Sequence, residues 1–154
     1  MPQLVRTNLI QDVHQVSAIM NSIDLSMVKR KIMDPEEGQG WTLEHAEEME
    51  MRYRRYLTML YLKPHSSIVP TRDIDLYWHQ HILDTRAYAA DCEKAFGFFV
   101  HHFPYFGMRD EEDARNLESS FEETKTFYYE LYAEDYCAHP ADHPATAVEI
   151  DQHR

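Results

Sequence analysis

One segment of the chain concentrates side chains of the kinds that bind metal ions. Residues 70–107, PTRDIDLYWHQHILDTRAYAADCEKAFGFFVHHFPYFG, contain four of the ten histidines, namely His79, His81, His101 and His102. Several aspartates and one cysteine lie among them. Neutral imidazole, carboxylate and thiolate are the ligands that transition metals select in proteins. The first hypothesis is therefore a metal site.

The spacing of these residues indicates which of them can share a metal. A step of four residues returns to nearly the same face of a helix, so Asp75 and His79 can chelate one ion. His79 and His81 would diverge by about 200° on a regular helix, and both reach one metal only if the helix is distorted between them. Otherwise His81 lies beside the site, where Asp84 could orient its imidazole.

The loop and the following helix complete the predicted site. Of the two adjacent histidines, we expect His102 to face inward, because it directly precedes the FPYFG turn. The predicted metal ligands are therefore Asp75, His79, His81 and His102. The predicted catalytic groups are Tyr77, Tyr88 and Asp91. Of these, Tyr88 and Asp91 lie on one helix face and can reach a common cleft.

These side chains also fit a purely structural interpretation. Histidines beside aromatic residues are often hydrogen-bonded core residues, and the aspartates at positions 73, 75 and 84 can cap helices. Cys92 is more typical of a small buried side chain than of a nucleophile. The gathering of four histidines in one segment favours the metal site over this alternative.

The elements that must position these residues are helices. Apolar residues recur at three- and four-residue steps, and capping residues, glycine and proline delimit the segments. Helices are expected at residues 9–23, 24–33, 42–63, 71–83, 84–96 and 110–136. Residues 97–107 have no helical spacing and should form an ordered aromatic loop that packs on the core.

This pattern predicts an all-α fold, a compact single-domain bundle of about five or six helices with an ordered aromatic loop. The single helical domain is expected to cover residues 1–136. The remaining residues 137–154 contain two prolines and little periodicity. They are expected to form a flexible C-terminal tail.

Composition argues against several classes of function. The formal net charge of -12 repels phosphate backbones and anionic lipid headgroups, so neither nucleic acid nor a membrane is an expected partner. The chain starts without the apolar core of a secretory signal and has only two cysteines, which favours a cytoplasmic location. Phosphate-binding glycine loops and the GxSxG, CxxC and HExxH motifs do not occur.

The run PTRDIDLYWHQHILDT, together with Tyr88 and Asp91, resembles the P-T-x-D-[IV]-D-x-x-W-H-x-H signature of the glycine-rich domain-containing protein-like family. Short bacterial members of that family are similar over nearly all of this chain, which lacks the glycine-rich region of the larger plant members. The resemblance implies that Asp75, His79, His81 and Asp91 belong to one motif. It implies no particular reaction.

Together these observations favour a metal-dependent enzyme. A mixed imidazole and carboxylate set fits non-haem Fe(II) best, followed by Zn(II) and Cu(II). With iron, the protein would be an oxidoreductase acting on a small molecule or peptide in specialised metabolism, in a dry pocket lined by Tyr77, Trp78, Tyr105 and Phe106. The alternatives are a zinc- or copper-binding protein with a hydrolytic or metal-handling role, and a non-catalytic protein-interaction module with a buried histidine and aromatic core.

Overall fold

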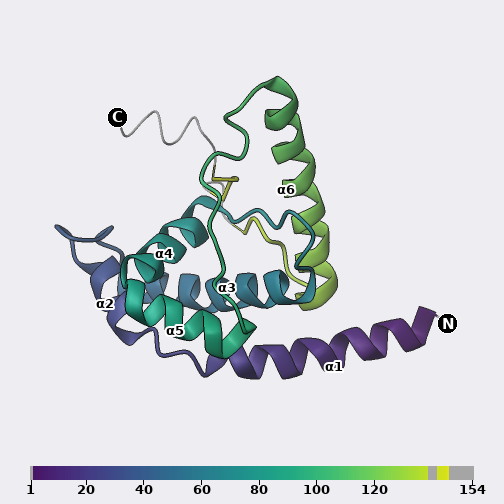
Figure 1. Cartoon of the computed structure of the whole chain (residues 1–154), viewed down its shortest axis with the longest axis horizontal. Coiled ribbons are helices and arrows are strands. Elements are labelled where there is room, and N and C mark those ends of the chain that lie inside the picture. Colours follow the sequence, from purple (N-terminus) through teal and green to yellow (C-terminus); the bar gives the residue numbers. More distant parts are fainter. Residues whose placement is uncertain (1, 139–141, 146–154) are drawn as a thin grey trace.

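The computed structural model describes residues 2–138 and 142–145, with side chains from residue 12 onward. Six α-helices make up most of this part of the chain: α1 (Pro2–Asn21), α2 (Ser26–Met33), α3 (Leu43–Leu62), α4 (Arg72–Leu83), α5 (Thr85–Phe96) and α6 (Glu111–Tyr132) (Figure 1). The described residues contain no strand, only an isolated bridge between Thr71 and Pro144. None of the described helices is long and apolar enough to cross a membrane. The predicted all-α fold is confirmed.

Local side-chain chemistry sets most of the helix ends. The side chains of Thr42, Thr71, Asp84 and Asp110 accept hydrogen bonds from backbone N–H groups in the first turns of α3, α4, α5 and α6. Gly97 ends α5 with a φ of 81°, in the left-handed region that favours glycine. The ends expected for α3, α4 and α5 agree with these caps.

Four helix ends differ by two residues or more from the expected bounds. Helix α1 begins at Pro2 rather than at residue 9 and ends at Asn21 rather than at residue 23. Helix α2 begins at Ser26, because the side chain of Asp24 accepts a hydrogen bond from the Ser26 backbone N–H and forms a turn before the helix. Helix α6 ends at Tyr132 rather than at residue 136, since Ala133 adopts a left-handed conformation with a φ of 54°.

Helix α3 is central to the bundle. It packs against α1 and α4, which lie on different sides of it in Figure 1, and α2 contacts both α3 and α4. Helix α5 packs on α4, and α6 contacts α1 while running steeply across the end of α3 in this view. Helix α4, which carries the WHQH sequence, is therefore held by three neighbours, α2, α3 and α5.

The buried side chains form one cluster that is rich in tyrosine. Two of these tyrosines hold the segment that precedes α4. The hydroxyl of Tyr56 donates to the carbonyl of Ile68, and the hydroxyl of Tyr136 donates to the carbonyl of Val69, each at 2.9 Å. A buried tyrosine hydroxyl needs a hydrogen-bond partner, so these bonds fix the path of residues 63–71 toward the start of α4.

The segment between α5 and α6 passes the start of α4 and enters α6 at the end of that helix drawn at the top of the view (Figure 1). Val100 and Phe106 pack against the core cluster. Four other rings of the loop are exposed: Phe98, Phe99, Phe103 and Tyr105. The expected packing of the loop on the core therefore holds for only part of it, because the loop lies over helices whose own side chains already fill the core.

Residues 142–145, which belong to the segment expected to be a tail, lie against the start of α4. The backbone N–H of Arg72 donates to the carbonyl of His143 at 2.9 Å. The backbone N–H of Ala145 donates to the carbonyl of Pro70 at 3.3 Å. The carboxylate of Asp142 also forms an ion pair with Arg52 of α3 at 3.2 Å. Residues 139–141 and 146–154 of the expected tail lie outside the described residues.

Candidate metal centre

Asp75 and His79 lie one turn apart on α4 and face the same space. The helix runs without interruption from Arg72 to Leu83, so side chains four residues apart share a face. The Nε2 atom of His79 lies 3.1 Å from Oδ2 of Asp75. The shared face predicted from the spacing of these two residues is confirmed.

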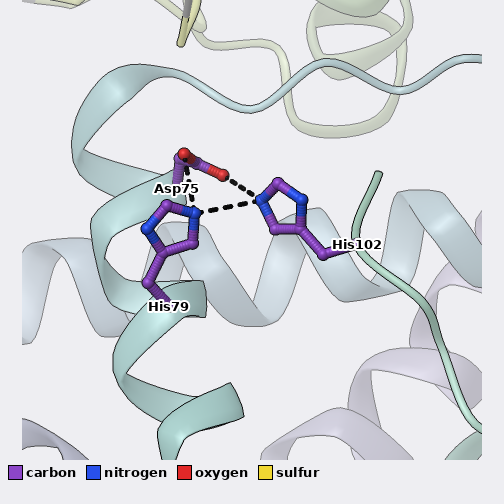
Figure 2. Close-up of side chains that lie close together, drawn as sticks. All are labelled: Asp75, His79 and His102. Carbon is purple, nitrogen blue, oxygen red and sulfur yellow. Dashed lines mark hydrogen bonds and ion pairs between the residues drawn. The ribbon is translucent and has the colours of Figure 1, made fainter. Parts of the chain in front are cut away.

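His102 reaches the same point from the loop between α5 and α6. Its Nε2 atom lies 2.6 Å from Oδ1 of Asp75 and 3.1 Å from Nε2 of His79. Figure 2 shows the two imidazoles pointing toward each other and toward the carboxylate from opposite sides. We call these three residues the Asp/His/His triad. Among the described residues, it is the one group of three or more potential ligands whose donor atoms cluster closely enough to hold a metal.

Trp78 holds His102 in this position. The two rings are stacked, with centroids 4.2 Å apart and an interplanar angle of 29°. His101, by contrast, is exposed and packs on Phe99, with ring centroids 4.8 Å apart. Of the two adjacent histidines, His102 therefore faces inward, as expected, and contacts Asp75, whereas His101 faces outward.

A hydrogen-bonded chain fixes the backbone just before His102. The indole Nε1–H of Trp78 donates to the hydroxyl of Tyr88 at 3.0 Å. That hydroxyl donates in turn to the carbonyl of Val100 at 2.5 Å. Helix α4 therefore positions His102 through the stacked ring of Trp78. Helix α5 contributes through Tyr88, whose hydroxyl holds the main chain at Val100.

Hydrogen bonding sets the charge of the triad. Burial raises the pKa of Asp75, but the hydrogen bonds with His102 and His79 outweigh burial and leave this pKa below its ordinary value. The hydrogen bond with Asp75 raises the pKa of His79, against the opposite effect of desolvation. Asp75 is therefore ionised at neutral pH, as a metal-binding carboxylate must be.

His81, the fourth expected ligand, lies apart from the triad on another face of α4. Its Nδ1 atom is 2.7 Å from the hydroxyl of Tyr53, and its Nε2 atom is 2.8 Å from Oδ2 of Asp91. Burial lowers the pKa of this imidazole. Because α4 is not distorted between His79 and His81, the two side chains diverge as their spacing requires. The orienting carboxylate is that of Asp91, whereas Asp84 caps α5.

The three residues expected to be catalytic do not line the pocket described below. Tyr77 lies in the core, where its ring contacts that of Tyr53 with centroids 5.1 Å apart. The hydroxyl of Tyr88 bonds to the loop, and Asp91 bonds to His81. Burial raises the pKa of Tyr77 and that of Tyr88. The helical spacing of Tyr88 and Asp91 is as expected, but this face turns toward the core rather than toward a cleft.

A pocket of about 650 Å³ opens at the triad, and all three triad residues form part of its wall. Most of the remaining wall is apolar and includes Leu60, Ile68, Leu76, Trp78, Phe103 and Phe106. Trp78 and Phe106 were expected there, whereas Tyr77 and Tyr105 are not among the lining residues. A concave, largely apolar site of this size suits a small organic molecule.

The triad geometry fits a first-row metal bound on one face. Metal bonds of about 2.1 Å at right angles would place neighbouring donor atoms about 3.0 Å apart, whereas tetrahedral angles would place them about 3.4 Å apart. The two imidazole nitrogens lie 3.1 Å apart, which is closer to the first value. Each of them also contacts one oxygen of Asp75, His102 with Oδ1 at 2.6 Å and His79 with Oδ2 at 3.1 Å. Three such ligands would leave further coordination positions for other molecules.

Several lining residues were not identified from the sequence. Arg72 lines the pocket together with Ser66 and Ser67 of the segment before α4. The position of Arg72 three residues before Asp75, on the same helix face, is a signal that could have identified it. The two serines carry no such signal, since their place depends on the tyrosine contacts that hold the segment.

Comparison with known proteins assigns the chain to a family. A family model described as UCP032817-like matches residues 17–131. The chain belongs to the UCP032817-like family. No curated protein and no solved structure matches it significantly. The part matched to the UCP032817-like family contains the whole triad and every lining residue of the pocket except Ala145.

Proposed function

We propose that this UCP032817-like protein is a metal-dependent oxidoreductase with Fe(II) held by Asp75, His79 and His102. One observation carries the proposal. Two imidazole nitrogens and a carboxylate converge within 2.6–3.1 Å of one another in the wall of a largely apolar pocket. Two histidines and one carboxylate on one side of a metal, with open positions opposite, are the ligand set of non-haem Fe(II) oxygenases.

Each residue of the site has a role in this proposal. Bound Fe(II) would supply redox chemistry and open positions for oxygen and a small-molecule or peptide substrate. Asp75 provides the negative charge and orients both imidazoles. Trp78 positions His102, and the apolar wall excludes water from the reacting atoms. Both described cysteines are free thiols, which fits a reducing compartment such as the cytoplasm.

The test is the metal content of protein purified without chelators. The wild type and the variants His79→Ala, His102→Ala and His101→Ala are compared, with helical circular dichroism as a check on folding. We expect about one equivalent of iron in the wild type and in His101→Ala. We expect less than about a tenth of that in the other two variants, because losing one of three ligands removes both affinity and geometry.

Other outcomes would contradict specific parts of the proposal. Stoichiometric zinc that iron cannot displace would contradict the oxidoreductase proposal and would favour a hydrolytic or metal-handling role. Full metal content in His79→Ala would remove this residue from the site. If the wild type binds none of Fe(II), Zn(II) or Cu(II), even on reconstitution, the protein is not a metal-dependent enzyme. That result would favour the protein-interaction module.

A further inference from the structure

Phe103 differs from the other aromatic residues of the pocket wall. Tyr56 and Trp78 are buried, and their polar groups already have hydrogen-bond partners. Phe106 is half-buried and packs against the core cluster. Phe103, by contrast, is 54% exposed although it lines the pocket. This ring therefore has free surface at the edge of the pocket, where a ligand can contact it.

Neighbouring side chains hold Phe103 at this edge. The guanidinium of Arg109 lies over the ring, with Cζ 5.0 Å from the ring centroid. The ring of Tyr105 is arranged edge to face with it, with centroids 5.6 Å apart. Arg109 is itself fixed by the carboxylate of Asp113, which accepts hydrogen bonds from Nε at 3.1 Å and from Nη2 at 2.6 Å. Because Asp113 is buried in the first turn of α6, Phe103 is anchored to a helix although it belongs to a loop.

The charge of the pocket wall indicates what the ligand must carry at its other end. A divalent metal held by one carboxylate and two neutral imidazoles would leave one net positive charge at the triad. Asp75 is the only carboxylate among the described residues of the wall. The guanidinium of Arg72 pairs with Asp73 at 3.5 Å, so these two charges offset each other. A charge in a largely apolar pocket is costly unless it is compensated, so a ligand with a single negative charge suits the site.

We propose that the pocket takes a small aromatic chelator, whose ring packs on Phe103 while two oxygen atoms that share one negative charge bind the metal at the triad. This inference rests on the proposed function, since it names the substrate class of the same site. Three protein ligands leave coordination positions for two such oxygens. A cavity of about 650 Å³ holds a molecule of this size. Phe103 is then the residue that selects aromatic chelators over other chelators.

The experiment compares three probes by calorimetric titration of the Zn(II)-loaded protein. Benzohydroxamate presents a ring and a chelating pair of oxygens, acetohydroxamate keeps the oxygens without the ring, and the O-methyl ester of benzohydroxamate keeps the ring but cannot form the chelating anion. The wild type, Phe103→Ala and Phe98→Ala are titrated. Phe98 is a matched control, since it is 55% exposed on the same loop but does not line the pocket. Metal content and circular dichroism are measured on every form before and after titration.

In the wild type and in Phe98→Ala, we expect benzohydroxamate to bind at least about tenfold more tightly than either other probe, because it alone uses both the ring and the ion. Its binding should release about one proton, which titrations in buffers of different ionisation enthalpy count. Phe103→Ala should bind benzohydroxamate about three- to tenfold less tightly. The same variant should keep the metal and the wild-type affinity for acetohydroxamate.

Three results would overturn the proposal. Equal affinity for benzohydroxamate and acetohydroxamate in the loaded wild type would show that the ring is not recognised. Equal affinity for benzohydroxamate in Phe103→Ala and Phe98→Ala would show that Phe103 does not contact the ligand. Binding of the O-methyl ester as tight as that of benzohydroxamate, or removal of the ion by benzohydroxamate, would show that the ligand is not held through the bound metal.

The metal content separates this inference from the proposed function. A wild type that holds one equivalent of metal but does not distinguish the probes contradicts the inference alone and leaves the metal centre in place. A wild type that takes up no metal contradicts the proposed function, and the inference fails with it because the ligand is held through the ion.

Discussion

Two histidines of α4, His79 and His81, have opposite surroundings although a single residue separates them. The side chain of His79 is 48% exposed and contacts Asp75, whereas His81 is 2% exposed and engaged at both ring nitrogens. A buried polar network stabilises a fold only while each member keeps its partner. In the proposed function His79 binds the metal, whereas the surroundings of His81 give it a structural role.

This assignment predicts opposite effects of two alanine substitutions. His81→Ala should lower the free energy of unfolding by about 2–4 kcal/mol, because Tyr53 and Asp91 both lose a partner in or near the core. Its metal content should stay at the wild-type level. His79→Ala should lose the metal while the unfolding free energy of the metal-free protein changes by less than about 0.5 kcal/mol.

Urea unfolding of metal-free protein and elemental analysis of loaded protein provide the two measurements. A folded His81→Ala protein without metal would contradict the assignment, because it would make His81 part of the metal centre. Tyr53→Phe is a useful companion, since it removes the contact at Nδ1 and leaves the imidazole in place.

At the scale of elements, the loop that delivers His102 is bounded by two glycines with positive φ, Gly97 at 81° and Gly107 at 89°. Their surroundings differ. A Cβ atom at Gly97 would meet nothing within 4 Å, whereas one at Gly107 would lie 2.6 Å from Cδ2 of the buried Leu117. The N–H of Gly107 also donates to Asp113 at 2.7 Å, which joins the end of the loop to the first turn of α6.

The two glycines should therefore differ in their tolerance of alanine. Gly97→Ala should cost about 1–2 kcal/mol of unfolding free energy, the cost of a left-handed conformation in a residue with a Cβ atom. Gly107→Ala should cost about 1–3 kcal/mol more, because the added methyl group must displace Leu117. Urea unfolding of both variants measures the difference. Equal losses would mean that Leu117 can move aside without penalty.

At the scale of the whole molecule, the triad joins segments that are distant in the sequence. Asp75 and His102 are 27 residues apart, and α5 lies between them in the chain. A ligand that binds the folded state but not the unfolded state raises the free energy of unfolding, by about 2.7 kcal/mol at a free concentration one hundred times the dissociation constant. Metal binding at the triad should therefore stabilise the entire bundle.

We expect saturating Zn(II) or Fe(II) to raise the thermal midpoint of the wild type by about 5–10 °C, and a chelator to reverse the shift. His101→Ala should show the same shift, and His102→Ala should show none. Thermal scans at several metal concentrations test this prediction. A metal-loaded wild type whose midpoint does not move would show that the ion binds without engaging the folded triad.

The sequence by itself determined the features that depend on neighbouring residues. The ends of α3, α4 and α5 follow from capping residues a few positions away, and the shared face of Asp75 and His79 follows from the helical repeat. The divergence of His81 from His79 follows from the same repeat. These features persist in any fold in which residues 72–83 are a regular helix.

Only the tertiary structure decided which distant groups meet. Whether His102 reaches Asp75 depends on the path of a loop, and whether Asp91 or Asp84 bonds to His81 depends on how α5 packs against α4. The inward direction of the Tyr88 and Asp91 face, and the entry of Arg72 into the pocket wall, depend on that packing as well. Helical periodicity states which residues share a face, but the burial of a face is set by contacts between elements far apart in the chain.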